Sequence, residues 1–122
     1  MQPLMRSPAA VYRKVDLDAR IEASRADDLT RICLDEAVTA MGQALIALER
    51  APETPPRATL PRAQSIAVYL ARAAAPDNPM RQTLTQVYGG LADAIGRNMS
   101  EPNAAEIKQV REDFQDLLNA VS

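Results

Sequence analysis

The sequence predicts an all-α protein: an antiparallel four-helix bundle with a short extra helix at its N-terminal end. The composition is 47% hydrophobic but only 3% aromatic, so the core must be built mainly from Ala, Leu, Ile, Val and Met, a set that favours helix. Apolar residues recur at intervals of three and four, and no segment shows the alternation of a strand. Short proline-containing breaks separate these segments, as expected between antiparallel neighbours.

A chain of 122 residues suits a single domain. Residues 1–10 contain two prolines and show no periodicity, and we expect them to form a disordered N-terminal arm. Residues 11–122 are expected to form one helical-bundle domain. Within it, residues 11–22 are predicted to form the short extra helix.

The longest predicted helix covers about residues 25–50. Ser24 is expected to cap it, with Asp27 as the partner in a capping box. Its main apolar stripe is Leu29, Ile32, Cys33, Ala37, Ala40, Met41, Ala44 and Leu48. Because Leu34, Val38, Leu45 and Ile46 lie beside or beyond that stripe, this helix is predicted to be apolar on more than one side.

Three further helices are predicted, at about 61–75, at about 79–99 and from about 103 to the end. The breaks between them contain prolines, which do not fit a helix interior. Asn103 and Glu106 have the spacing of a capping box at the start of the last helix. The residues expected to face inward are Ala63, Ile66, Ala67 and Leu70, then Met80, Leu84, Val87, Leu91 and Ile95, then Ile107, Val110, Phe114, Leu117 and Val121.

Nothing in the sequence indicates catalysis. The chain contains no histidine, the commonest general base and metal ligand, and its one cysteine, Cys33, lies within an apolar stripe. Gly89 and Gly90 follow no strand and form no phosphate-binding motif, so we expect them to allow close approach of a neighbouring backbone, from inside the bundle or from a partner. We therefore expect no enzyme activity, no cofactor and no bound metal.

Charge and hydropathy indicate which partners and which cellular location to expect for the protein. The net charge is -2, and acidic and basic residues are balanced in both halves, so nucleic-acid binding is not expected. The longest apolar run, residues 66–71, is too short for a membrane span, and the N-terminus lacks the pattern of a signal peptide. With one cysteine no intrachain disulfide can form. We expect a cytoplasmic protein without membrane insertion.

The order of short motifs resembles the flagellar secretion chaperone family FliS. The motifs are Tyr12 opening the first helix, then Glu22-Ala23-Ser24-Arg25, then Asp28-Leu29, then Leu34-Asp35-Glu36-Ala37. The family usually has proline where Arg25 stands, and tyrosine and glycine in place of Leu34 and Glu36. It often has a tryptophan near the C-terminus, which this chain lacks. The chain therefore resembles a divergent member.

The resemblance implies a small antiparallel helical bundle of the bacterial cytoplasm. Members of the family bind the disordered C-terminal segment of flagellin, prevent its premature polymerisation and deliver it to the flagellar type III export apparatus. The N-terminal segment of such a chaperone can cover part of the same surface when flagellin is absent. Tyr12 and Val15 would belong to that segment.

A disordered client that folds on binding needs apolar grooves on the outside of a rigid scaffold. From spacing, we expect Val38, Leu45 and Ile46 to form one wall, and Val68 with Tyr69, and Tyr88 with Ala92, to form others. Tyr69 and Tyr88 could instead be rim residues of the core. The alternative function is a non-catalytic, self-associating helical scaffold or adaptor, and the expected state is a monomer or weak homodimer.

Overall fold

The computed structural model describes the backbone of residues 8–121 and the side chains of residues 28–121. Its elements are α1 (Pro8–Arg50), α2 (Leu60–Ala73), α3 (Arg81–Ser100) and α4 (Ala104–Val121), and the described residues contain no strand. The predicted all-α four-helix architecture is confirmed.

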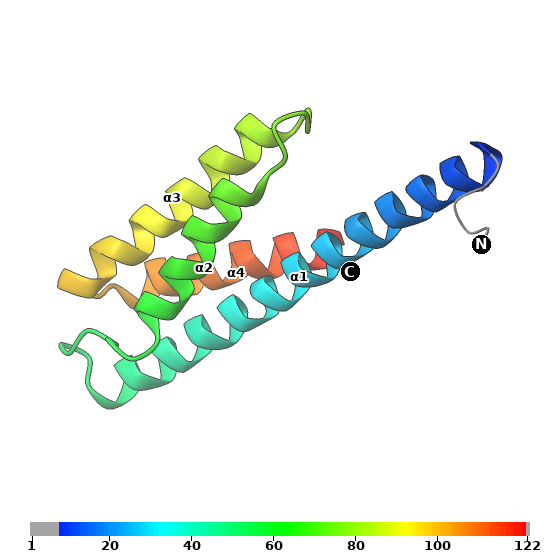
Figure 1. Cartoon of the computed structure of the whole chain (residues 1–122). Coiled ribbons are helices and arrows are strands. Elements are labelled where there is room, and N and C mark those ends of the chain that lie inside the picture. The colour runs from blue at the N-terminus through cyan, green and yellow to red at the C-terminus, as the bar shows by residue number, and fades with distance from the viewer. Residues whose placement is uncertain (1–7, 122) are drawn as a thin grey trace.

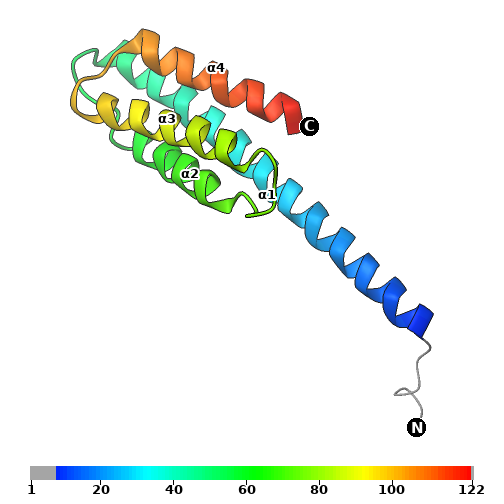
Figure 2. The same ribbon diagram turned by 90° about the horizontal axis from the view of Figure 1, so that it is seen from above.

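The four helices alternate in direction along the chain, as Figures 1 and 2 show. Each helix packs against two neighbours, most closely within the pairs α2–α3 and α1–α4, and least closely between α3 and α4. In Figure 1, α3 and α4 lie close at the 101–103 connection and separate toward the start of α3. The bundle is therefore tighter at one end than at the other.

The prediction of a separate short N-terminal helix is wrong. Residues 11–22 and the expected break at residues 24–28 all belong to α1, which is continuous from Pro8 to Arg50. The physical reason is that the proposed break contains neither proline nor glycine, and its residues cost only tenths of a kcal/mol each inside a helix. Ser24 is thus an interior helical residue and not an N-cap. Of the predicted disordered arm, residues 1–7 lie outside the described residues, and residues 8–10 already belong to α1.

Proline sets the other helix boundaries, as expected. The 51–59 connection contains three prolines, and Pro61 lies in the first turn of α2, where a missing N–H costs nothing. Before α3, the Asn78 side-chain oxygen accepts a hydrogen bond from the Met80 N–H over 2.8 Å. This turn ends before the helix begins at Arg81, two residues later than predicted.

The core is mainly aliphatic, with two aromatic rings, those of Tyr88 and Phe114. Its fully buried residues include Leu34, Ala37, Ala40, Met41, Ala44, Leu60, Ala63, Ala67, Ile95, Ile107 and Phe114. The many alanines let neighbouring helices approach closely. Leu34, expected beside the main stripe, is buried, whereas some residues assigned to the inward stripes are exposed: Leu29, Ile32, Met80, Val87 and Val121. Periodicity indicates that a helix has an apolar side, but not from which direction its neighbours arrive.

Candidate partner-binding surfaces

Three of the residues expected on outer walls are buried. Val38, Tyr88 and Ala92 belong to the hydrophobic core, and Tyr88 is only 5% exposed. That prediction of their placement is wrong for a physical reason: α1 and α3 each pack against both α2 and α4, so each helix needs two apolar stripes for the bundle itself. Burial also raises the pKa of the Tyr88 hydroxyl above its ordinary value.

Two other predicted residues are exposed. The side chain of Ile46 on α1 is 50% exposed, and that of Tyr69 on α2 is 47% exposed. Leu45 and Val68 are half-buried and pack against the edge of the core. Tyr12 and Val15 lie in α1, but their side chains fall outside the described residues.

Two shallow hollows contain the half-buried residues. One, of about 420 Å³, includes Leu45 together with Pro52, Pro102 and Lys108, so it lies between the end of α1 and the start of α4. The other, of about 360 Å³, lies on α2 alone and includes Val68 and Tyr69. The structure thus places these predicted residues on two separate surfaces and not in one groove.

A third surface was not predicted from the sequence. A groove of about 560 Å³ runs between α3 and α4, and its apolar lining is Val87, Gly90, Leu91, Ala94, Val110 and Leu117. A Cβ atom built on Gly89 or Gly90 would meet no atom within 4 Å. The glycine pair therefore does not serve close packing inside the bundle. Of the two uses expected for it, close approach of a backbone from inside the bundle is wrong, and close approach of a partner stays a prediction. Two consecutive glycines within a helical pattern were the sequence signal for this surface.

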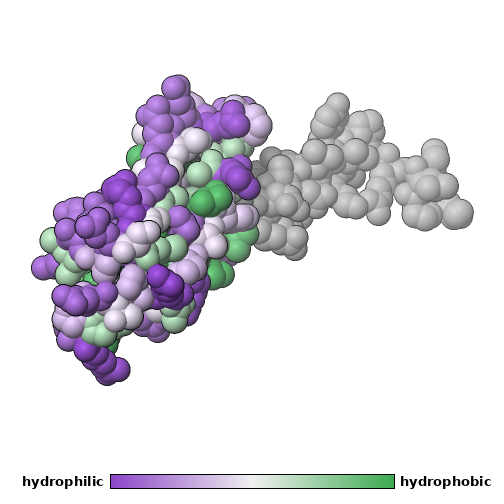
Figure 3. Space-filling model, turned by 90° about the vertical axis from the view of Figure 1, so that its left-hand side faces the viewer, coloured by the Kyte–Doolittle hydropathy of each residue, from purple (hydrophilic) through white to green (hydrophobic). Residues whose placement is uncertain are grey.

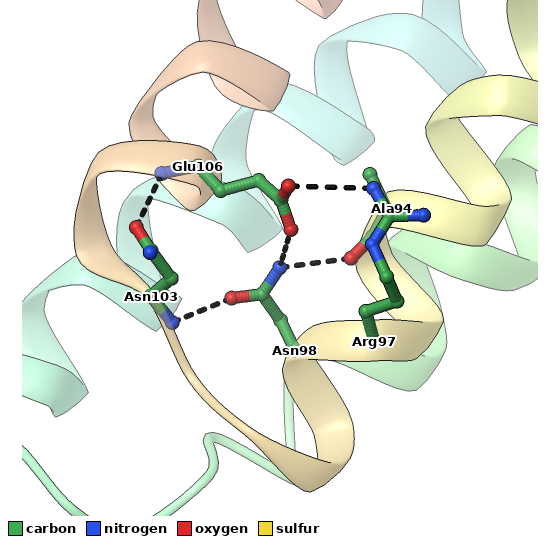
Figure 4. A network of polar contacts seen from close by, with 5 residues as sticks. All are labelled: Ala94, Arg97, Asn98, Asn103 and Glu106. Carbon is green, nitrogen blue, oxygen red and sulfur yellow. Dashed lines mark hydrogen bonds and ion pairs between the residues drawn. The ribbon is translucent and has the colours of Figure 1, made fainter.

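A polar network joins α3 to α4 at the Glu106 end of this groove, and Figure 4 shows its contacts. Asn98 is 1% exposed, and its Nδ2 donates hydrogen bonds to the Ala94 carbonyl over 2.8 Å and to Glu106 Oε1 over 2.6 Å. Its Oδ1 accepts a hydrogen bond from the Asn103 N–H over 2.7 Å. Arg97 donates to the other Glu106 oxygen over 3.3 Å.

The same network modifies the predicted capping box. The Asn103 side-chain oxygen accepts a hydrogen bond from the Glu106 N–H over 3.0 Å, which confirms Asn103 as the cap of α4. The Glu106 carboxylate does not return to the Asn103 N–H, because Asn98 occupies that donor. The start of α4 is thus held by a residue from the last turn of α3.

The other groups that could take part in metal binding or catalysis are few among the described residues. Among the described residues, no group of three or more potential ligands is placed to hold a metal ion. Cys33 is half-buried, and burial raises the pKa of its thiol above the ordinary value. The face drawn in Figure 3 is mainly hydrophilic, with smaller hydrophobic areas between the polar ones.

The comparisons with known proteins give no match: no family model, no curated protein and no solved structure matches the chain. Over the residues that the structure describes, none of the helices combines the length and the apolar character needed to cross a membrane.

Proposed function

We propose that this protein is a divergent chaperone of the FliS type, which binds the disordered C-terminal segment of flagellin in the bacterial cytoplasm. In this role it prevents premature polymerisation and delivers the client to the flagellar type III export apparatus. It performs no catalysis and uses no cofactor. The resemblance of the Tyr12, Ser24, Asp28-Leu29 and Asp35–Ala37 motifs supports this assignment.

The structural observation that carries the proposal is the exposure of large apolar side chains on two different helices of a well-packed bundle. Ile46 on α1 and Tyr69 on α2 are each about half exposed. An extended client can contact separate surfaces in sequence, because it is not limited to one pocket. The two hollows beside Leu45 and Val68 give such a client places to insert side chains.

The test is a calorimetric titration of the full chain with the C-terminal segment of flagellin from the same organism. We expect one-to-one binding with a large negative heat-capacity change, because apolar surface is buried as the client folds. Ile46→Asp and Tyr69→Asp should each weaken binding by roughly tenfold or more, since a charge replaces an apolar anchor.

The matched control is Gln43→Asp, which adds the same charge at an exposed polar position of α1. It should leave binding unchanged, and circular dichroism should show all three variants folded. Absence of binding by the unmodified chain would contradict the flagellin assignment. If the chain then dimerised at high concentration and Ile46→Asp abolished that dimer, the self-associating scaffold would be the better description.

A further inference from the structure

The α3–α4 groove is built differently from the surfaces assigned to the client. Its floor is apolar, and Val87 on its α3 wall is exposed although it lies on the stripe expected to face inward. The two walls separate away from the Asn98–Glu106 contact, and Gly90 leaves open space where another residue would place a side chain. The groove is therefore an unfilled apolar channel between two helices.

Positive and negative side chains of α4 lie on different sides of the helix. The cations face α1: Lys108 lines the hollow beside Leu45, and Arg111 lies over α1, 3.4 Å from the position of a Cβ atom on Gly42. The carboxylates of Asp113 and Asp116 line the α3–α4 groove instead, and no lysine or arginine lines it. The groove therefore combines an apolar floor with a rim whose charged side chains are all negative.

Neither rim carboxylate pairs with a lysine or arginine among residues 28–121. Asp113 accepts a hydrogen bond over 3.0 Å from Gln109, whose side chain is uncharged. None of the ion pairs among the described residues includes Asp113 or Asp116. Glu106, the third carboxylate of the groove, is already paired with Arg97. Two carboxylates thus remain to attract a cation.

We propose that this groove docks an amphipathic helix of another protein, with its apolar stripe on the floor and lysine or arginine residues beside Asp113 and Asp116. The charge complementarity selects a basic partner. The lining runs from Gln86 to Ala94 on α3 and from Glu106 to Leu117 on α4, which corresponds to roughly 12–16 Å of helix and accepts two to three turns of partner. Asp113 and Asp116 are neighbours at helical spacing, so two basic residues about one turn apart can meet them. This docking site goes beyond the proposed flagellin surfaces and does not depend on them.

The probe is a synthetic amphipathic peptide of about 18 residues, long enough to form a helix, with a leucine stripe flanked by lysines. A second peptide carries glutamate in place of every lysine. We expect the lysine peptide to bind more tightly by roughly tenfold, with an affinity that falls as salt is added. Amide shifts observed by NMR should change along α3 and α4.

Two matched pairs of variants locate the binding. Gly90→Leu adds a side chain to the groove lining at a position where a Cβ atom would meet no atom within 4 Å, whereas Gly89→Leu adds the same side chain beside it at a position that does not line the groove. Asp116→Asn removes a rim charge, whereas Glu112→Gln removes an exposed charge of α4 outside the groove. Gly90→Leu and Asp116→Asn should weaken the lysine peptide by about tenfold and about threefold respectively, and their controls should not.

Equal binding of the two peptides, or binding that Gly90→Leu leaves unchanged, would overturn the proposal. A concentration-dependent dimer that Gly90→Leu abolishes would also overturn it, because a second copy of the chain would then cover the groove. Failure of the flagellin titration would not affect these outcomes, since the variants and the probe are different.

Discussion

Asn98 on α3 donates a hydrogen bond from Nδ2 to Oε1 of Glu106 on α4 over 2.6 Å, and this contact joins the two least closely packed neighbours of the bundle. The amide uses both of its ends, because Oδ1 accepts from the Asn103 N–H at the start of α4. One buried residue thus sets the 101–103 connection and the Glu106 end of the groove beside it.

Asn98→Ala should lower the free energy of unfolding by about 2–4 kcal/mol, because it leaves the Asn103 N–H and a Glu106 oxygen without their partner. Urea denaturation measures the change. The matched control is Asn119→Ala, which removes an exposed amide that accepts a hydrogen bond from Gln115 and should cost less than about 0.5 kcal/mol. Equal effects of the two substitutions would contradict the role assigned to Asn98.

Gly90→Ala should raise the free energy of unfolding by about 0.5–1 kcal/mol, since alanine favours helix and the added methyl group meets open space. Gly96→Ala should bring no such gain. Its Cβ would lie 2.9 Å from Gln64 Nε2, which donates to the Ala92 carbonyl and would have to move. Thermal unfolding of both variants tests the contrast, and a gain from Gly96→Ala equal to that from Gly90→Ala would refute it.

Cys33 should react slowly with a thiol reagent in the folded protein. Burial raises the pKa of its thiol above the ordinary value of 9.0, so less of the reactive thiolate is present at any lower pH. The rate of labelling, followed against pH, should show its midpoint above 9.0 in the folded chain. The same chain unfolded in urea is the control and should show an ordinary midpoint. A folded-state midpoint at or below the ordinary value would contradict this.

Stability should fall at alkaline pH, partly through Tyr88. Its pKa is raised by burial above the ordinary value of 10.0, so the unfolded chain releases the Tyr88 proton more readily than the folded chain does. The stability contributed by this difference is therefore complete below pH 10.0 and is lost as the pH rises toward the folded-state pKa. Tyr88→Phe should reduce the alkaline loss measured by urea denaturation. An alkaline loss that Tyr88→Phe leaves unchanged would contradict this role of Tyr88.

The breaks and the main helices were predictable from the sequence because they depend on local chemistry. The prolines of the 51–59 connection, Pro61 and the cap at Asn103 act within a few residues of the boundaries that they set. The core positions Ala63, Leu70 and Phe114 also followed from periodicity, because their helices expose the opposite face. The same local reasoning failed at residues 24–28, where polar residues resembled a cap but nothing forces the chain out of the helix.

Only the tertiary structure decided which apolar residues remain on the surface. Val38 and Tyr88 were expected to lie outside and are buried, whereas Val87, one residue from Tyr88, is exposed in a groove. The sequence shows that residues 25–50 carry more apolar residues than one stripe needs, and this property depends only on local spacing. Which stripe is covered depends on the directions from which α2 and α4 approach. The groove beside Gly90 exists because α3 and α4 separate from the Asn98–Glu106 contact onward, and the orientation of two whole helices is not encoded at any single position.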